Sequence, residues 1–390
     1  MVRPARVRFR SRYLQAVPRA ARHILAPVLA ALAVLVLAPA VASASTSTST
    51  STSTLSYHNP LRNPATGGPL SCPDPSVTYE PAPSTGYALV CTSGFNPNGF
   101  PIYVSQDLVH WRADGYVFPH GHQPWWAVHS TGHPKGGRYW APEINRVDGR
   151  WMVYFAAEDN AAKLGLRIPG HGRVTDGKMI IGYATATSLR GPWHTGVLHW
   201  AGQFNGVSSE REDLVPSIDP SLLSDPVTGQ LYLYWSDQPT QIWAGELSSD
   251  GTTLEPQIHR VLRSSEPFEC DPRDGHCTIE APEPYFTNGM VYLLYSGAST
   301  WDSSYAVGVA SSTDPLGPFV KLGHPILRQG DGFYSTGHTS EPVLGPDGNL
   351  YILYHARTSP GVHRPSDTRY LMLGRFAMGA SGWPTISQAP

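Results

Sequence analysis

The chain has 390 residues, of which 41% are hydrophobic, so it is long enough to bury a substantial core. It carries 28 lysines and arginines against 30 aspartates and glutamates, and seven of the arginines precede residue 45, which leaves 21 against 30 in the remainder. That mildly acidic balance excludes nucleic acid and anionic membranes as expected partners. The 37 prolines and 38 glycines, without a long window of helical period after the N-terminal segment, favour an all-β protein rich in turns.

Residues 1–44 are predicted to be a secretory signal peptide. A basic leader without acids precedes an apolar run over residues 24–37, and Ala42-Ser43-Ala44 has the small residues of a cleavage site. A membrane anchor is the alternative, but the run is shorter than the ~20 apolar residues needed to span a bilayer, and it contains Pro27. We therefore expect a secreted, extracellular protein that leaves the membrane after cleavage. A Ser/Thr-rich linker over residues 45–56 and one folded domain over 57–390 are expected to follow.

A strand-turn-strand unit recurs five times in that domain. Each copy has a short strand headed by a carboxylate, a turn dipeptide ending in glycine, and a strand of bulky β-formers. The second strands cover residues 87–92, 151–156, 231–236, 290–296 and 350–355, and the carboxylates are Asp74, Glu143, Asp219, Glu283 and Glu341. A repeat of this kind predicts a five-bladed β-propeller, whereas a β-sandwich gives no reason for one unit to recur. Because inner strands line the axis of a propeller, the repeat brings carboxylates together.

Four cysteines in an exported chain indicate two disulfides. Proximity along the repeat favours Cys72–Cys91 and Cys270–Cys277, with other pairings open. No Cys-x-x-Cys spacing is present, which argues against zinc.

Chemical context selects among the carboxylates. Asp74 and Asp219 share the frame Asp-Pro-Ser, and the fourth repeat adds Glu280 three residues ahead of Glu283. Two aspartates and a glutamate that converge on one pocket match glycoside hydrolysis, in which one carboxyl protonates the leaving oxygen and another, ionised, activates water or attacks carbon. Any single Asp-Pro is also explained as a strand-entry turn with a capping side chain. The three together favour catalysis.

Five short motifs give the chain a resemblance to glycoside hydrolase family 43, over roughly residues 59–376. They are Cys-Pro-Asp-Pro-Ser at 72–76, Trp-Ala-Pro-Glu at 140–143, Ser-Ile-Asp-Pro-Ser at 217–221, Glu-Ala-Pro at 280–282 and Gly-His-Thr-Ser at 337–340. The family usually shows Glu-Gly-Pro where this chain has Glu280-Ala281-Pro282. The resemblance implies an inverting enzyme with Asp74 as general base, Glu280 as general acid and Asp219 as the group that orients and tunes Glu280.

The same resemblance implies a substrate class. Family 43 acts on arabinose- and xylose-containing polysaccharides, so we expect a poly- or oligosaccharide substrate. An α-L-arabinofuranosidase or arabinanase is the first expectation, β-xylosidase the second and galactan cleavage the third. We expect a monomer.

His338 is expected on the propeller axis. The resemblance implies a calcium ion beside it, although a buried, hydrogen-bonding histidine is the ordinary alternative. Calcium prefers oxygen ligands, so waters would supply most of its shell, and no cofactor is expected for the chemistry itself. Four other histidines, His120, His122, His129 and His133, crowd a Gly/Pro-rich segment that is better explained as a solvated loop.

Aromatic residues near the expected pocket are candidates for binding sugar. Trp125 and Trp126 are either stacking platforms or a pair packed under a loop. Phe95, Trp140, Trp235 and Trp301 follow pocket-facing strand ends and are expected to form walls. Arg357 is expected to contact a sugar hydroxyl or to hold Asp74 ionised.

Three other functions fit parts of the sequence. An invertase- or levansucrase-like retaining enzyme shares the five blades, and Glu269-Cys270 resembles the Glu-Cys signature of that group. The invertase-type Asn-Asp-Pro-Asn-Gly opening is absent, however, and Cys270 is expected in a disulfide. A catalytically silent carbohydrate-binding propeller conflicts with the presence of all three carboxylates. A scaffold protein finds no support in any large apolar surface run.

Overall fold

The computed structural model describes residues 54–81, 85–93, 96–127, 138–158, 179–200, 217–237, 240–361 and 368–388. Residues Ser51–Pro390 group into one compact unit, and the predicted signal peptide lies outside the described residues, as does most of the linker. The regular secondary structure of the described residues is nearly all strand, with one 3-10 turn at Pro267–Glu269. None of their helical segments is long and apolar enough to span a membrane.

The first two sheets are four-stranded antiparallel meanders. The first contains β1 (Ser76–Glu80), β2 (Gly86–Val90), β3 (Gly99–Ser105) and β4 (Arg112–Phe118). The second contains β5 (Tyr139–Val147), β6 (Arg150–Glu158), β7 (Met179–Ala186) and β8 (His194–Val197).

The remaining three sheets repeat this meander with small additions. The third contains β10 (Ile218–Ser224), β11 (Leu231–Ser236), β12 (Gln241–Leu247) and β13 (Thr253–Arg263), and β9 (His199–Trp200) joins β13 in parallel. The fourth contains β14 (Ile279–Thr287), β15 (Met290–Gly297), β16 (Ala306–Ser312) and β17 (Val320–Lys321). The fifth contains β18 (Tyr334–Gly337), β20 (Leu350–Arg357), β21 (Tyr370–Met378) and β22 (Pro384–Ser387), and β19 (Val343–Leu344) pairs with β20.

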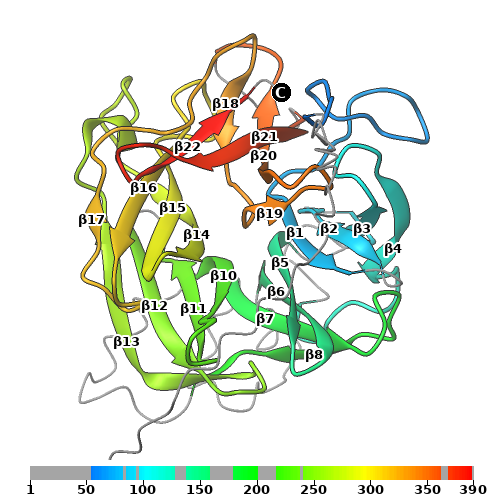
Figure 1. Ribbon diagram of the computed structural model, residues 1–390. Coiled ribbons are helices and arrows are strands. Elements are labelled where there is room, and N and C mark those ends of the chain that lie inside the picture. The colour runs from blue at the N-terminus through cyan, green and yellow to red at the C-terminus, as the bar shows by residue number, and fades with distance from the viewer. Residues whose placement is uncertain are drawn as a thin grey trace, which may run out of the picture. The chain divides into compact units, whose positions relative to one another are not determined.

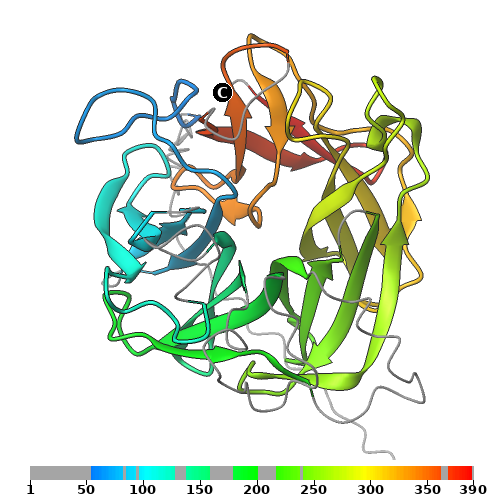
Figure 2. The same cartoon turned by 180° about the vertical axis from the view of Figure 1, so that it is seen from behind.

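These sheets are the blades of a five-bladed β-propeller (Figures 1 and 2). Contacts run from β1 to β5, from β5 to β10, from β10 to β14, from β16 to β18 and from β19 back to β1, so the ring closes. The fold class predicted from the repeat is confirmed.

The turns of the repeat form as their residues require. Asp148-Gly149 and Asn288-Gly289 each have positive φ at both positions, which is the type I′ geometry that matches strand twist in a two-residue hairpin. Both predicted disulfides are present: Cys72–Cys91 ties the entry of β1 to the end of β2, and Cys270–Cys277 closes a small hairpin ahead of β14. Disulfides of this kind are typical of proteins in oxidising compartments.

The core lies between neighbouring blades. Between the first two blades, Phe100, Phe118, Tyr139 and Phe155 form a fully buried aromatic cluster, on which Trp126 stacks with ring centroids 5.8 Å apart from Phe155. Gly182 leaves room for that indole, because a Cβ there would lie 2.5 Å from it. The packing holds the inner strands in fixed positions around the axis.

Candidate active site

The inner strand of each blade begins with a backbone irregularity. Asp74, Ala141, Asp219, Ala281 and His338 all have positive φ, between 44° and 52°. In the second, third and fourth blades a register shift falls at this point. Such bulges bend the strand and redirect its side chains. The backbone strain of positive φ at residues other than glycine is found mostly at functional positions. The five residues occupy equivalent places at one end of the ring, where the inner strands start.

The equivalence of these five positions corrects the alignment of the five repeats that was predicted from the sequence. Asp74 and Asp219 occupy the bulge position, but Glu143 and Glu283 lie two residues further on, level with Ser76 and Ser221. The five carboxylates of the repeat are therefore not equivalent. They divide into an upper set at the strand starts, which Glu280 joins, and a lower set formed by Glu143, Glu283 and Glu341.

Asp74 is buried beside one guanidinium and two imidazoles. Arg369 places Nη1 2.5 Å from Oδ1 and Nη2 3.3 Å from Oδ2, and His338 Nδ1 lies 3.2 Å from Oδ1. The Asp74 N–H donates to His355 Nδ1 at 3.2 Å. Burial by itself raises the pKa of Asp74, but Arg369 and the two histidines outweigh burial and hold the pKa well below its usual value. Asp74 is therefore ionised over the whole physiological range.

Asp219 and Glu280 have the opposite character. Asp219 Oδ2 accepts the Ala281 N–H at 3.0 Å, which ties Asp219 to the residue beside Glu280. Burial raises the pKa of Asp219 well above its ordinary value, and the charges of Glu280 and Asp74 add to that rise. Burial also raises the pKa of Glu280, despite the Tyr305 hydroxyl, which donates to Oε1 at 2.7 Å. The pair thus keeps a proton where isolated carboxyls would lose theirs.

Three partners of the carboxylates were not found from sequence. Arg369 comes from the segment before β21, Tyr305 from the segment before β16 and His355 from β20. His355 is fully buried, burial lowers its pKa to about 3, and its ring stacks on Tyr305 at 5.9 Å. The role expected of Arg357 in holding Asp74 ionised belongs to Arg369. Arg357 is buried and donates to the Thr300 carbonyl at 3.2 Å.

The aromatic candidates divide by exposure. Trp126 and Trp235 are fully buried, so the expectation that they contact sugar is wrong for this structure. Trp140 is half-buried and has the Arg138 guanidinium over its ring. Trp125 and Trp301 are 43% and 46% exposed and lie on connections at the end of the ring that holds the upper carboxylates. Phe95, His129 and His133 lie outside the described residues.

Glu269, the residue behind the invertase-like alternative, is a structural group. It is fully buried, Lys321 Nζ lies 2.5 Å from its Oε1, and the Tyr295 hydroxyl donates to the same oxygen at 2.7 Å. Its neighbour Cys270 is in a disulfide. This observation removes the Glu-Cys pair from the pocket.

His338 occupies the positive-φ position of the fifth blade, with its Nδ1 3.2 Å from Asp74 Oδ1, and burial lowers its pKa to about 4, so the ring is neutral. Among the described residues no group of three or more His, Cys, Asp or Glu side chains is arranged to hold a metal. The calcium ion expected beside His338 stays a prediction.

Asp74, which is held ionised, and the pair of Asp219 and Glu280, which keeps a proton, lie at the same end of the ring, and glycoside hydrolysis uses such an arrangement. The family comparison agrees: a model described as glycosyl hydrolases family 43 matches residues 61–384, and the chain belongs to this family.

Individual relatives are more distant. An extracellular exo-α-(1→5)-L-arabinofuranosidase of Streptomyces chartreusis is 27% identical over 60% of this chain and 66% of its own length. A non-reducing end α-L-arabinofuranosidase of Bacteroides ovatus is 25% identical over 84% of this chain and 54% of its own. The chain thus spans roughly half to two thirds of these relatives. A solved thermostable family-43 glycoside hydrolase aligns with a TM-score of 0.67 at 23% identity, over 86% of this chain and 98% of that one.

Proposed function

We propose that the protein is a secreted, inverting glycoside hydrolase that cleaves α-L-arabinofuranosyl linkages in plant polysaccharides, as an arabinofuranosidase or arabinanase. The observation that carries the proposal is the split in protonation: Arg369 keeps Asp74 ionised, while Asp219 and Glu280 retain a proton. The two disulfides and the extracellular relatives support secretion.

The mechanism uses each group in the state that its surroundings favour. Asp74 accepts a proton from a water molecule as that water attacks the anomeric carbon. Glu280 gives its proton to the glycosidic oxygen as the bond to carbon breaks. Asp219, tied to the Ala281 amide, holds Glu280 in place, and the two coupled carboxyls keep a proton between them. A single displacement follows, so the anomeric centre inverts.

A β-xylosidase is the second candidate. A relative named as a putative β-xylosidase, from Xylanibacter ruminicola, is 24% identical over 75% of this chain and 46% of its own length. The carboxylate arrangement serves either pentose, so loops around the pocket must decide between them. The exposed Trp125 and Trp301 are proposed to contact the sugar in both cases.

One experiment tests both the reaction and the substrate. The protein is incubated with arabinan, arabinoxylan, xylan and the two p-nitrophenyl pentosides, and the products are sized. Proton NMR of the preferred substrate, recorded before mutarotation, should show the anomer of inverted configuration. Retained configuration, or transfer to added methanol, would overturn the single-displacement mechanism.

A further inference from the structure

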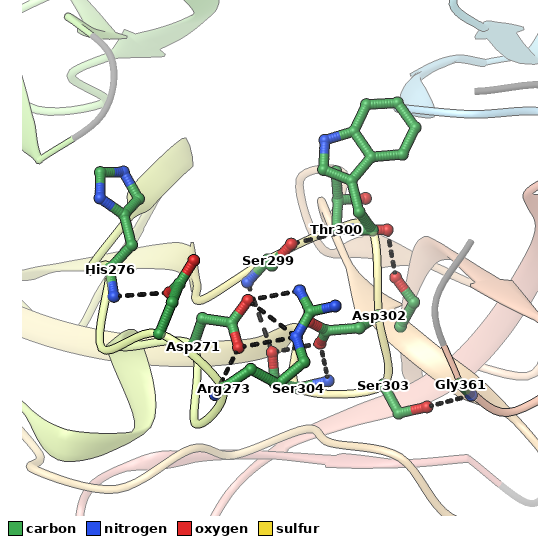
Figure 3. Close-up of polar contacts among 12 residues, drawn as sticks. Asp271, Arg273, His276, Ser299, Thr300, Asp302, Ser303, Ser304 and Gly361 are labelled. Atoms are coloured by element: carbon green, nitrogen blue, oxygen red, sulfur yellow. Dashed lines mark hydrogen bonds and ion pairs between the residues drawn. The ribbon is translucent and has the colours of Figure 1, made fainter. Parts of the chain in front are cut away.

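The connection between β15 and β16, residues 298–305, is held by an ion-pair clamp (Figure 3). Arg273, in the hairpin closed by Cys270–Cys277, places Nη2 2.5 Å from Asp271 Oδ2 and 2.6 Å from Asp302 Oδ2. Its Nε also donates to Asp271 Oδ1 at 3.0 Å. Both carboxylates are more than nine-tenths buried, so the clamp is shielded on the acid side. The disulfide-closed hairpin and the β15–β16 connection are thereby joined through one guanidinium.

The other flank of the connection is fastened to the fifth blade. The Thr300 carbonyl accepts hydrogen bonds from Ser335 Oγ at 2.9 Å and from Arg357 Nη2 at 3.2 Å. The Gly361 N–H donates to Ser303 Oγ at 3.1 Å. The backbone before Trp301 is therefore held by two side chains of the fifth blade, and the Ser303 side chain after it is held by the backbone N–H of Gly361.

Trp301 itself stays 46% exposed in the middle of this fixed backbone. Large aromatic side chains are usually buried or used, and a rigidly mounted, exposed indole offers a flat apolar face at little entropic cost. The same connection places that face near the catalytic carboxyls, because four residues after Trp301 the Tyr305 hydroxyl donates a hydrogen bond to Glu280. The connection therefore carries both Trp301 and the partner of the carboxyl that protonates the leaving oxygen.

We propose that Trp301 forms a subsite for the sugar unit on the leaving-group side of the scissile bond, and that Arg273 is its positioning residue. The inference rests on the proposed function, since it assigns a side to the cleaved linkage. A pentose unit stacks its apolar face on the indole, and the clamp from Arg273 to Asp302 keeps the indole in that position. The ligand class is an oligosaccharide with at least one unit beyond the cleaved bond.

The first test compares ligands that do and do not reach this subsite. Trp301→Ala should raise KM for arabinohexaose, or for xylohexaose if the wild type prefers it, by about tenfold, with kcat within about threefold. Inhibition by free arabinose or xylose, which fills only the pocket for the transferred sugar, should not change. Trp301→Phe should recover part of the loss. Tyr79→Ala, which removes an aromatic of similar exposure from the far end of β1, is the matched control and should leave both constants unchanged.

The second test separates positioning from stability. Arg273→Gln should raise KM for the hexasaccharide about threefold to fivefold without changing inhibition by the monosaccharide, and Arg273→Lys should restore part of the affinity. If Arg273 had a purely structural role, Arg273→Gln would lower Tm without raising KM for the hexasaccharide selectively over the inhibition constant of the monosaccharide. Wild-type KM values in Arg273→Gln would overturn the positioning role.

A binding measurement keeps the proposal independent of turnover. Binding of both hexasaccharides is measured by calorimetry to the Glu280→Gln variant and to Glu280→Gln combined with Trp301→Ala. Weaker binding in the combined variant supports the subsite even if the wild type hydrolyses neither sugar, a result that would overturn only the proposed function. Equal binding to the two variants overturns the subsite while leaving the proposed function intact. Failure of Glu280→Gln to bind either sugar overturns both.

Discussion

Two sets of three carboxylates lie along the same propeller axis and behave differently. The upper set, Asp74, Asp219 and Glu280, includes one group paired with Arg369 and has its pKa values pushed apart. The lower set consists of Glu143, Glu283 and Glu341. Among the described residues, Ser221 Oγ donates to Glu283 at 3.2 Å and Asn145 Nδ2 donates to Glu143 at 2.9 Å.

In the lower set every pKa moves the same way. Burial raises the pKa of Glu143 to about 7 and that of Glu341 to about 8, and it raises the pKa of Glu283 well above its ordinary value. Within the described residues no arginine or lysine pairs with any of the three. Burial of carboxyls alone therefore raises all of their pKa values. A cation beside one carboxyl of the set is needed to lower its pKa, so that the set contains both an acid and a base.

The largest expected difference between the two sets is in turnover. Asp74→Asn, Asp219→Asn and Glu280→Gln should each lower kcat by roughly 10²–10⁴-fold, because each removes a proton acceptor, a tuning charge or a proton donor. Glu143→Gln should keep kcat within a few-fold, since it lies in the lower set. Steady-state kinetics on the preferred substrate, with circular dichroism to confirm folding, measures both.

Glu269→Gln provides a control outside both sets. It should leave kcat unchanged but lower Tm, because it removes the charge that pairs with the mostly buried Lys321. A kcat loss comparable to that of Glu280→Gln would return the invertase-like mechanism to consideration. Near-normal turnover in any one of the upper-set variants would remove that residue from the catalytic group.

The next effect is on pH dependence and tests whether Arg369 makes the difference. Arg369 lowers the pKa of Asp74, so Arg369→Gln should raise that pKa and protonate the base under mildly acidic conditions. The acid limb of kcat/KM should move to higher pH, with a loss of about tenfold or more at pH 5 and a smaller loss at pH 7. A profile that drops equally at all pH values would indicate that Arg369 only binds substrate.

A smaller effect is expected from the hydroxyl on Glu280. The hydrogen bond from Tyr305 lowers the pKa of Glu280 against the effect of burial. Tyr305→Phe should therefore raise that pKa and move the alkaline limb of the profile upward, while kcat falls about fivefold from looser positioning of the carboxyl. A downward movement of the alkaline limb would contradict this role.

The sequence predicted the fold, both disulfides and the residues of the upper set, because turn chemistry and strand pattern are local signals. It misplaced Glu143 and Glu283, which lie two residues beyond the positive-φ position of their strands, and Glu341, which lies three residues beyond His338, because such offsets leave no trace in residue type. Arg369 and Asp74 are 295 positions apart, and nothing near either residue marks the pairing. The adjacent Trp125 and Trp126 face opposite environments, which the dipeptide alone does not specify.

The smallest effect concerns the stability contributed by the lower set. An unfolded glutamate has a pKa of about 4.3, whereas Glu143 and Glu341 in the fold have values of about 7 and about 8. Between these limits the folded state binds more protons than the unfolded state, so stability is full at about pH 4 and falls as the pH rises toward about 8. Glu143→Gln has no proton to lose and should retain the hydrogen bond from Asn145, so its Tm should fall roughly 2–4 °C less than wild type between pH 5 and pH 8. Differential scanning calorimetry across this range measures the slopes, with Glu255→Gln on the outer strand β13 as the matched control that should follow wild type. A Glu143→Gln slope as steep as that of wild type would mean that the lower carboxyls ionise freely in the folded protein.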